Sequence, residues 1–99
     1  MKLCFNEQDL IDSVCVFTAW RYEKRPEQVQ AELFYEEGKG FSATASVDNG
    51  LYKYPISEQD LIDGVAIYLR DYHNFDPQRL LIELFFEEGK GFSAEIEVR

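Results

Sequence analysis

The sequence predicts an α+β fold: a two-layer, pseudo-two-fold arrangement of tandem β-α-β-β repeats, with two helices on one face of a mainly antiparallel sheet. One observation is that residues 5–47 align with residues 56–98 without a gap, and that the blocks EQDLID and EEGKGFSA occur once in each copy. A second is that each copy contains a helical pattern followed by alternating segments. We therefore expect an internal duplication within a single domain, residues 1–99, made of repeat one, 1–49, and repeat two, 50–99.

Each repeat contains one expected helix, over residues 7–23 and over residues 58–73. Asn6 and Ser57 are suitable N-caps, and an aspartate follows each of them three positions later, as in a capping box. A proline lies just beyond each expected helix and prevents its continuation.

Segments that alternate between apolar and polar residues and are rich in aromatic residues indicate strands. The expected long strands are 29–35, 41–47, 80–86 and 92–98, with shorter leading strands at 2–5 and 51–54. The Glu-Gly-Lys-Gly segments between the long strands predict tight turns, and Asn49-Gly50 predicts a further hairpin.

Two apolar residues fall outside the helical stripes that should cover the sheet. They are Val16 and Ile67, and the small residues Ser13 and Gly64 lie on the same side of their helices. Small residues allow helices to approach closely, so we expect a helix–helix contact across the pseudo-axis. The alternative is that Val16 and Ile67 are single exposed aliphatic residues.

The face of the sheet away from the helices is the most informative surface. Alternation places Phe34, Leu81 and Phe85 on it, and we expect Tyr52 and Tyr54 to join them. A contiguous patch of exposed rings indicates a docking surface for a second copy or for another protein. The alternative is that Phe34 and Phe85 are two isolated exposed rings.

Trp20 extends the Val16 stripe, but Asp71 occupies the equivalent position in repeat two, so burial is not required there. An exposed tryptophan would be a candidate anchor for a partner. The alternative is that Trp20 folds over the edge of the sheet.

The net charge of −9 argues against several partners. It repels phosphate backbones and anionic lipids, so we expect neither nucleic-acid nor membrane binding. We expect a cytoplasmic protein, because the sequence shows no membrane-spanning segment and no export signal. Cys4 and Cys15 then serve as reduced packing residues, with a disulfide or a reactive thiol as the alternative.

Catalytic, cofactor and metal sites find little support, and we predict none of them. The carboxylates of EQDLID suit the first turn of a helix, and those beside the glycine turns do not form a dedicated calcium loop. The sole histidine, His73, has no candidate nucleophile beside it. We therefore predict a protein that is not an enzyme.

The run NEQDLIDSVCVFTAWRYEKRPEQVQAEL, followed by EEGKGFSA and LIDGVAIYLRDY, resembles the YxcD-like family of small bacterial proteins of unknown function. The resemblance covers essentially the whole chain. It implies a bacterial, cytoplasmic origin and carries no activity, ligand or site residue.

The function expected from these observations is that of a small acidic protein-interaction module. We expect a homodimer or a protein partner, bound through the open sheet face or an exposed strand edge. The alternative is a small-ligand binding domain with a pocket between the two repeats.

Overall fold

The structure is a computed structural model that describes residues 1–99. The elements are β1 (Lys2–Phe5), α1 (Glu7–Tyr22), β2 (Val29–Glu36), β3 (Gly40–Val47), β4 (Tyr52–Ile56), α2 (Glu58–His73), β5 (Leu80–Glu87) and β6 (Gly91–Val98). A short 3₁₀ turn precedes β2 and another precedes β5. The predicted α+β fold and its pseudo-repeat β-α-β-β pattern are confirmed.

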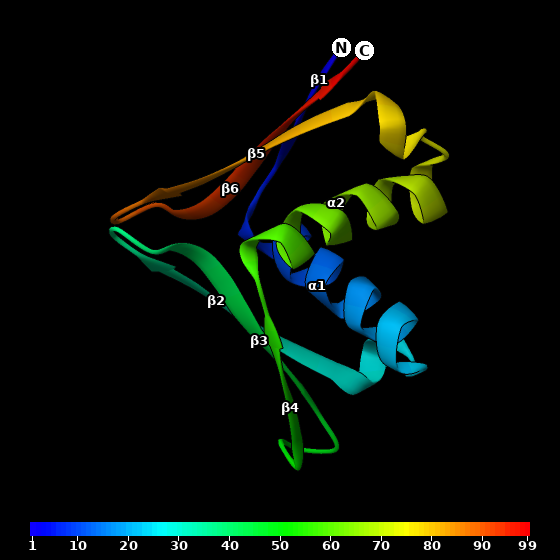
Figure 1. The fold of residues 1–99 in the computed structure, drawn as a ribbon, viewed down its shortest axis with the longest axis vertical. Helices are drawn as coiled ribbons and strands as arrows, with labels where there is room; N and C mark the ends of the chain where they lie inside the picture. Colours follow the sequence, from blue (N-terminus) through cyan, green and yellow to red (C-terminus); the bar gives the residue numbers. More distant parts are fainter.

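The strands form two three-stranded antiparallel sheets instead of the single sheet expected from the sequence. The terminal sheet has the order β1-β6-β5, and the central sheet has the order β2-β3-β4. The first strand of each repeat therefore pairs with the last strand of the other repeat, β1 with β6 and β4 with β3. The sheets diverge from two hairpin tips that lie close together, and the helix pair lies between them (Figure 1). The two repeats are interlocked, because each sheet contains strands from both.

Both helices begin at the predicted residues for the predicted reason. In α1 the Asn6 side chain accepts a hydrogen bond from the Asp9 backbone N–H, and Asp9 accepts one from the Asn6 N–H. Ser57 and Asp60 make the same reciprocal pair at the start of α2. Each helix ends at a residue with left-handed backbone conformation, three residues before the proline that marks its limit in the sequence.

The core lies between the helix pair and the inner face of each sheet. The central residues of the sheets, such as Ala45 and Ile96, and of the helices, such as Val14 and Val65, have no more than 1% of their surface exposed. Helix α1 packs against β2 of the central sheet and β6 of the terminal sheet, and α2 packs against β3 and β5. The predicted assignment of aliphatic side chains to the helix-facing side is confirmed.

The helices approach each other most closely where small residues were predicted to meet. A methyl group added to Gly64 would lie 3.2 Å from the Ser13 carbonyl oxygen and 3.2 Å from Cβ of Phe17. Val16 and Ile67 are both buried and belong to the same cluster of core residues. The prediction of a tight helix–helix contact is therefore confirmed at Ser13 and Gly64.

The expectation for Tyr52 and Tyr54 is wrong, because β4 presents both to the inner side of the central sheet. Tyr52 lies opposite Val47, and Tyr54 lies opposite the buried Ala45. Facing residues of antiparallel strands project to the same side, so these tyrosines cannot join Phe34 on the outer face. The Tyr54 ring instead stacks on Tyr22 of α1, with the ring centroids 3.8 Å apart.

Neither helix is long and apolar enough to cross a membrane.

Candidate functional site

Four aromatic rings fill the space between the two hairpin tips. They form what we call the tip cluster: Tyr35, Phe41, Phe86 and Phe92. Tyr35 and Phe86, from different repeats, stack with their centroids 5.2 Å apart, and Phe41 and Phe92 meet at 6.3 Å. These contacts join the inner faces of the two sheets next to the hairpin tips, on the side toward which both helices begin.

The inner position of the tip cluster determines where Phe34 and Phe85 point. Each is adjacent in sequence to a ring of the cluster, and successive side chains of a strand project to opposite faces. Phe34 therefore lies on the outer face of the central sheet and Phe85 on the outer face of the terminal sheet. Because the outer faces of the diverging sheets turn away from each other, the expected single patch containing both rings is not formed (Figure 1).

The outer face of the terminal sheet has more large apolar side chains than that of the central sheet. Its edge strand β5 carries Leu81, Glu83 and Phe85 outward, with Leu81 45% exposed and Phe85 39% exposed. The matching strand β2 has Gln30 in the place of Leu81. Strand β5 is thus the one edge strand that presents two large apolar side chains on its outer face.

Strand β5 also has an unpaired edge. It forms backbone pairs with β6 on one side only, over residues 80–87, and it ends its sheet on the other side. An unpaired edge presents a row of free N–H and C=O groups that can template a further strand. The outer row of side chains and the free backbone groups of β5 together make it the candidate docking site.

Acidic residues surround this site. Glu83 lies opposite Glu95 on the neighbouring strand, and Lys2 forms an ion pair with Glu95 at 3.2 Å. This contact with Glu95 raises the pKa of Lys2 above its ordinary value. One lysine therefore offsets part of a negatively charged outer surface.

Trp20 is exposed on α1, with 58% of its surface accessible. Its nearest ring contact is with Phe17 of the same helix, with centroids 6.1 Å apart. It does not belong to the outer face of either sheet.

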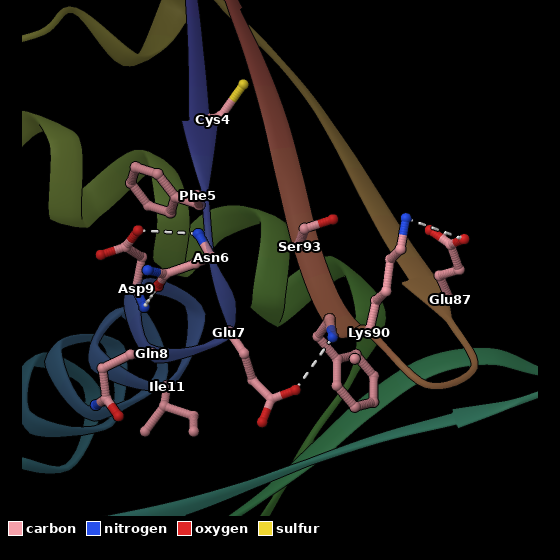
Figure 2. A pocket seen from close by; sticks show the side chains of 12 residues that line it. Cys4, Phe5, Asn6, Glu7, Gln8, Asp9, Ile11, Glu87, Lys90 and Ser93 are labelled. Atoms are coloured by element: carbon pink, nitrogen blue, oxygen red, sulfur yellow. Dashed lines mark hydrogen bonds and ion pairs between the residues drawn. The ribbon is translucent and has the colours of Figure 1, made fainter.

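The helix-start carboxylates are engaged in structural contacts. Figure 2 shows the surroundings of the α1 start, where a cavity of about 700 Å³ opens beside the β5–β6 hairpin. Asn6 and Asp9 bond reciprocally, and Lys90 pairs with Glu87 at 3.6 Å. Asp12 accepts a hydrogen bond from Gln8 at 2.9 Å. Each charged side chain of this cavity thus makes a structural contact, and we assign the cavity no ligand.

Glu7 and Glu58 make contacts that sequence reasoning missed. Each carboxylate accepts a hydrogen bond from a backbone N–H in the other repeat, Glu7 from Phe92 and Glu58 from Phe41. Both donors lie in the EEGKGFSA blocks, so the two blocks that the repeats share contact each other across the molecule. The only sequence signal for these contacts was that EQDLID and EEGKGFSA are identical in the two repeats, and identical sequence does not by itself indicate that two segments touch.

A second cavity, of about 630 Å³, lies between the repeats. Its walls come from α1, from the start of β2 and from Tyr68 and Tyr72 of α2. The two tyrosine rings stack with centroids 5.2 Å apart. Burial raises the pKa of the Tyr68 hydroxyl, and the negative charges of Asp12 and Asp9 raise it further.

The two cysteines differ in their surroundings. The expectation that both cysteines are packing residues is wrong for Cys4, which is exposed on β1. Cys15 is partly buried on α1 and donates from its thiol to the Val29 carbonyl oxygen at 3.4 Å. Burial, with a smaller contribution from Asp12, raises the pKa of Cys15 from 9.0 to about 11. Both thiols are free.

The sole histidine, His73, lies against the ring of Tyr68, with the ring centroids 5.7 Å apart.

No group of three or more His, Cys, Asp or Glu side chains is arranged to hold a metal ion.

The sequence matches a family described as "Protein of unknown function (DUF2653)" twice, over residues 1–54 and over residues 51–99. The boundary between the two matches falls where the pseudo-repeats meet. The chain is also 37% identical over 99 residues to the "Uncharacterized protein YxcD" of Bacillus subtilis (strain 168), covering 99% of this chain and 95% of that protein. No solved structure matches the chain.

Proposed function

Because the chain belongs to the DUF2653 family of proteins of unknown function, we propose a role for it from its own surface: a non-enzymatic interaction module that pairs with a second copy of itself through strand β5. The observation that carries the proposal is the combination, in one edge strand, of an unpaired backbone and the exposed side chains of Leu81 and Phe85. Antiparallel pairing of two β5 strands would join the two terminal sheets into one continuous sheet.

The exposed surface of the chain supports association. Its accessible area is 6434 Å², whereas a monomeric protein of 11.6 kDa exposes about 5,800 Å². The excess is similar in size to the area that each partner loses in a stable interface, about 800 Å². Burying Leu81 and Phe85 against a second copy would remove apolar surface that is otherwise in contact with water.

Charge limits the register of such a pair. A two-fold register centred on Glu83 would place two like charges directly opposite each other, which is unfavourable. A register centred on Leu84 instead places Glu83 beside Phe85 of the second copy. Since each copy carries a net charge of −9, added salt should strengthen the association by screening the repulsion.

The non-enzymatic part of the proposal is supported by the engagement of the polar side chains described above. The carboxylates of Glu7 and Asp9 hold backbone N–H groups. The cytoplasm is the location that we propose, because both cysteines are free thiols.

The test is a measurement of molar mass by size-exclusion chromatography with light scattering, over a range of protein and salt concentrations. The wild type should be a dimer, and the double variant Leu81→Gln/Phe85→Ser should be a monomer with an unchanged circular dichroism spectrum. Leu81→Gln copies the residue of the twin strand. The matched control is Phe34→Ser on β2, which should leave the dimer intact. A wild type that stays monomeric at every concentration would refute the proposal.

A further inference from the structure

The interlocked repeats contain two equivalent sites between their helices, and the two differ in one decisive residue. In the first site, Arg21 of α1 pairs with Asp60 of α2 at 3.2 Å, and its guanidinium carbon lies 5.6 Å from the centre of the Phe17 ring. A cation is thus held by a carboxylate and an aromatic ring that the chain itself supplies. Trp20 and Asp63 complete the walls of this site.

The twin site keeps an aromatic ring and two carboxylates, has Asp71 in the place of Trp20, and has no basic residue in the place of Arg21. Tyr68 takes the place of Phe17, Asp9 and Asp12 take the places of Asp60 and Asp63, and Tyr72 takes the place of Arg21. Neither Asp9 nor Asp12 forms an ion pair with a basic side chain of the chain.

One oxygen of Asp9, which lines a smaller cavity beside Tyr68, is available. Its Oδ2 atom accepts the capping hydrogen bond from the Asn6 N–H, and Oδ1 has no protein donor. In Asp60 the corresponding Oδ1 atom is the one that accepts from Arg21, while Oδ2 accepts from the Ser57 N–H. Asp9 Oδ1 is therefore a free acceptor, whereas the equivalent atom of Asp60 accepts a hydrogen bond from the Arg21 guanidinium.

The first site is occupied by the Arg21 side chain, whereas a cavity adjoins the twin site. Asp12, Tyr68 and Tyr72 line the cavity of about 630 Å³ between the repeats, and Tyr72 is 57% exposed. Stacked tyrosine rings offer a flat face to a planar cation, and guanidinium stacks on such faces better than a compact ammonium does. The apolar floor of the cavity, which includes Val16 and Ala31, suits the methylene stem of an arginine.

We propose that the cavity beside Tyr68 and Tyr72 binds the guanidinium group of an arginine side chain presented by another polypeptide. The stacked rings pack against its planar face, and Asp12, which lines the same cavity, supplies the counter-charge. The net charge of −9 draws a basic segment toward this surface. This binding is independent of pairing through β5, because the cavity and strand β5 do not share a residue.

The test uses the full chain labelled with ¹⁵N and titrated with a blocked pentapeptide that has one arginine flanked by glycines. Amide resonances around Asp12, Tyr68 and Tyr72 should shift, and the shifts should shrink as salt is added. The same peptide with citrulline in place of arginine has the same shape without the charge, and it should cause no such shifts. Absence of shifts with the arginine peptide, or equal shifts with the citrulline peptide, overturns the proposal.

Two variants sharpen the result. Tyr72→Arg copies Arg21 and supplies an internal cation, so it should weaken peptide binding at least about tenfold. Asp12→Asn preserves the shape and should also weaken binding, whereas Asp63→Asn at the twin position should leave it unchanged. Undiminished binding in both Tyr72→Arg and Asp12→Asn contradicts the proposal.

Discussion

The Glu7 carboxylate of repeat one accepts a hydrogen bond from the Phe92 backbone N–H of repeat two at 3.1 Å, and Glu58 accepts the reciprocal bond from Phe41 at 3.0 Å. This relationship gives a physical reason for the blocks that the repeats share. The first residue of EQDLID in one repeat bonds the strand that follows the glycine turn of EEGKGFSA in the other. The helix starts and the hairpins are thereby fixed to each other across the pseudo-axis.

Glu7→Ala should lower the free energy of unfolding by about 1–2 kcal/mol, because it leaves the Phe92 N–H without its charged acceptor. Urea denaturation followed by circular dichroism measures the change. Glu88→Ala is the matched control, since Glu88 is exposed and makes no hydrogen bond or ion pair, and it should change stability by less than about 0.5 kcal/mol. Equal effects of the two substitutions would show that the contact contributes nothing.

Gly91→Ala should be more damaging than Gly89→Ala. Both glycines have positive φ, 89° at Gly91 and 87° at Gly89, so an alanine is strained at either position. A methyl group at Gly91 would also collide with the Glu7 carboxylate, whereas Gly89 has open space around it. Thermal unfolding of the two variants should therefore differ, and the difference should shrink when each is combined with Glu7→Ala. A difference that persists in that background would contradict this explanation.

Cys15 should be unreactive at neutral pH, because burial raises its pKa to about 11 and keeps the thiol protonated. Cys4 is exposed, so alkylation of the folded protein at pH 8 should modify Cys4 and spare Cys15. Mass spectrometry of the digested protein locates the label. Rapid labelling of Cys15 in the folded protein would show that its side chain is more accessible than the structure indicates.

The raised pKa of Cys15 also has a consequence for alkaline stability. The thiol loses its proton near pH 9 in the unfolded chain and near pH 11 in the folded chain, so the unfolded state gains stability across this window. Stability is thus fully present below pH 9.0 and declines as the pH rises toward about 11. Cys15→Ala, which copies Ala66 of the twin helix, should show a smaller decline in urea unfolding over this range. Identical declines would contradict the assignment.

Thr18→Val should stabilise the protein by about 1 kcal/mol, because the buried Thr18 hydroxyl has no hydrogen-bond partner. The twin position carries Leu69, which is also buried, so an apolar side chain suits this environment. The midpoint of urea unfolding measures the effect. A loss of stability would mean that the hydroxyl has a partner, such as a carbonyl of its own helix.

Most of the secondary structure could be predicted because its signals are local. The N-caps of both helices, the alternation in the long strands and the glycine turns act over a few residues, and the element bounds follow them closely. The pairing of β4 with β3 was predicted from the Asn49-Gly50 hairpin and is observed, whereas the pairing of β1 with β6 could not be predicted in the same way. It depends on contacts between segments that are far apart in the sequence. The alternation of apolar and polar residues within one strand does not indicate which strand it pairs with.

The candidate site was predictable in its residues and only partly in its geometry. Leu81 and Phe85 lie on an outer face as alternation indicates, but Tyr52 and Tyr54 lie on the inner one. The side on which β4 places its residues depends on its register against β3 across the turn after Val47, and a shift of one residue reverses it. The contact of Arg21 with Asp60 could not be predicted, because it depends on how the two helices pack.

Amide hydrogen exchange along β5 and β2 tests self-pairing most directly, because the strands are structural twins and only β5 is proposed to pair. At high protein concentration the amides of β5 should exchange more slowly than the equivalent amides of β2, and dilution or the Leu81→Gln/Phe85→Ser variant should remove the difference. Exchange that is equally fast in both strands and independent of concentration would contradict the account.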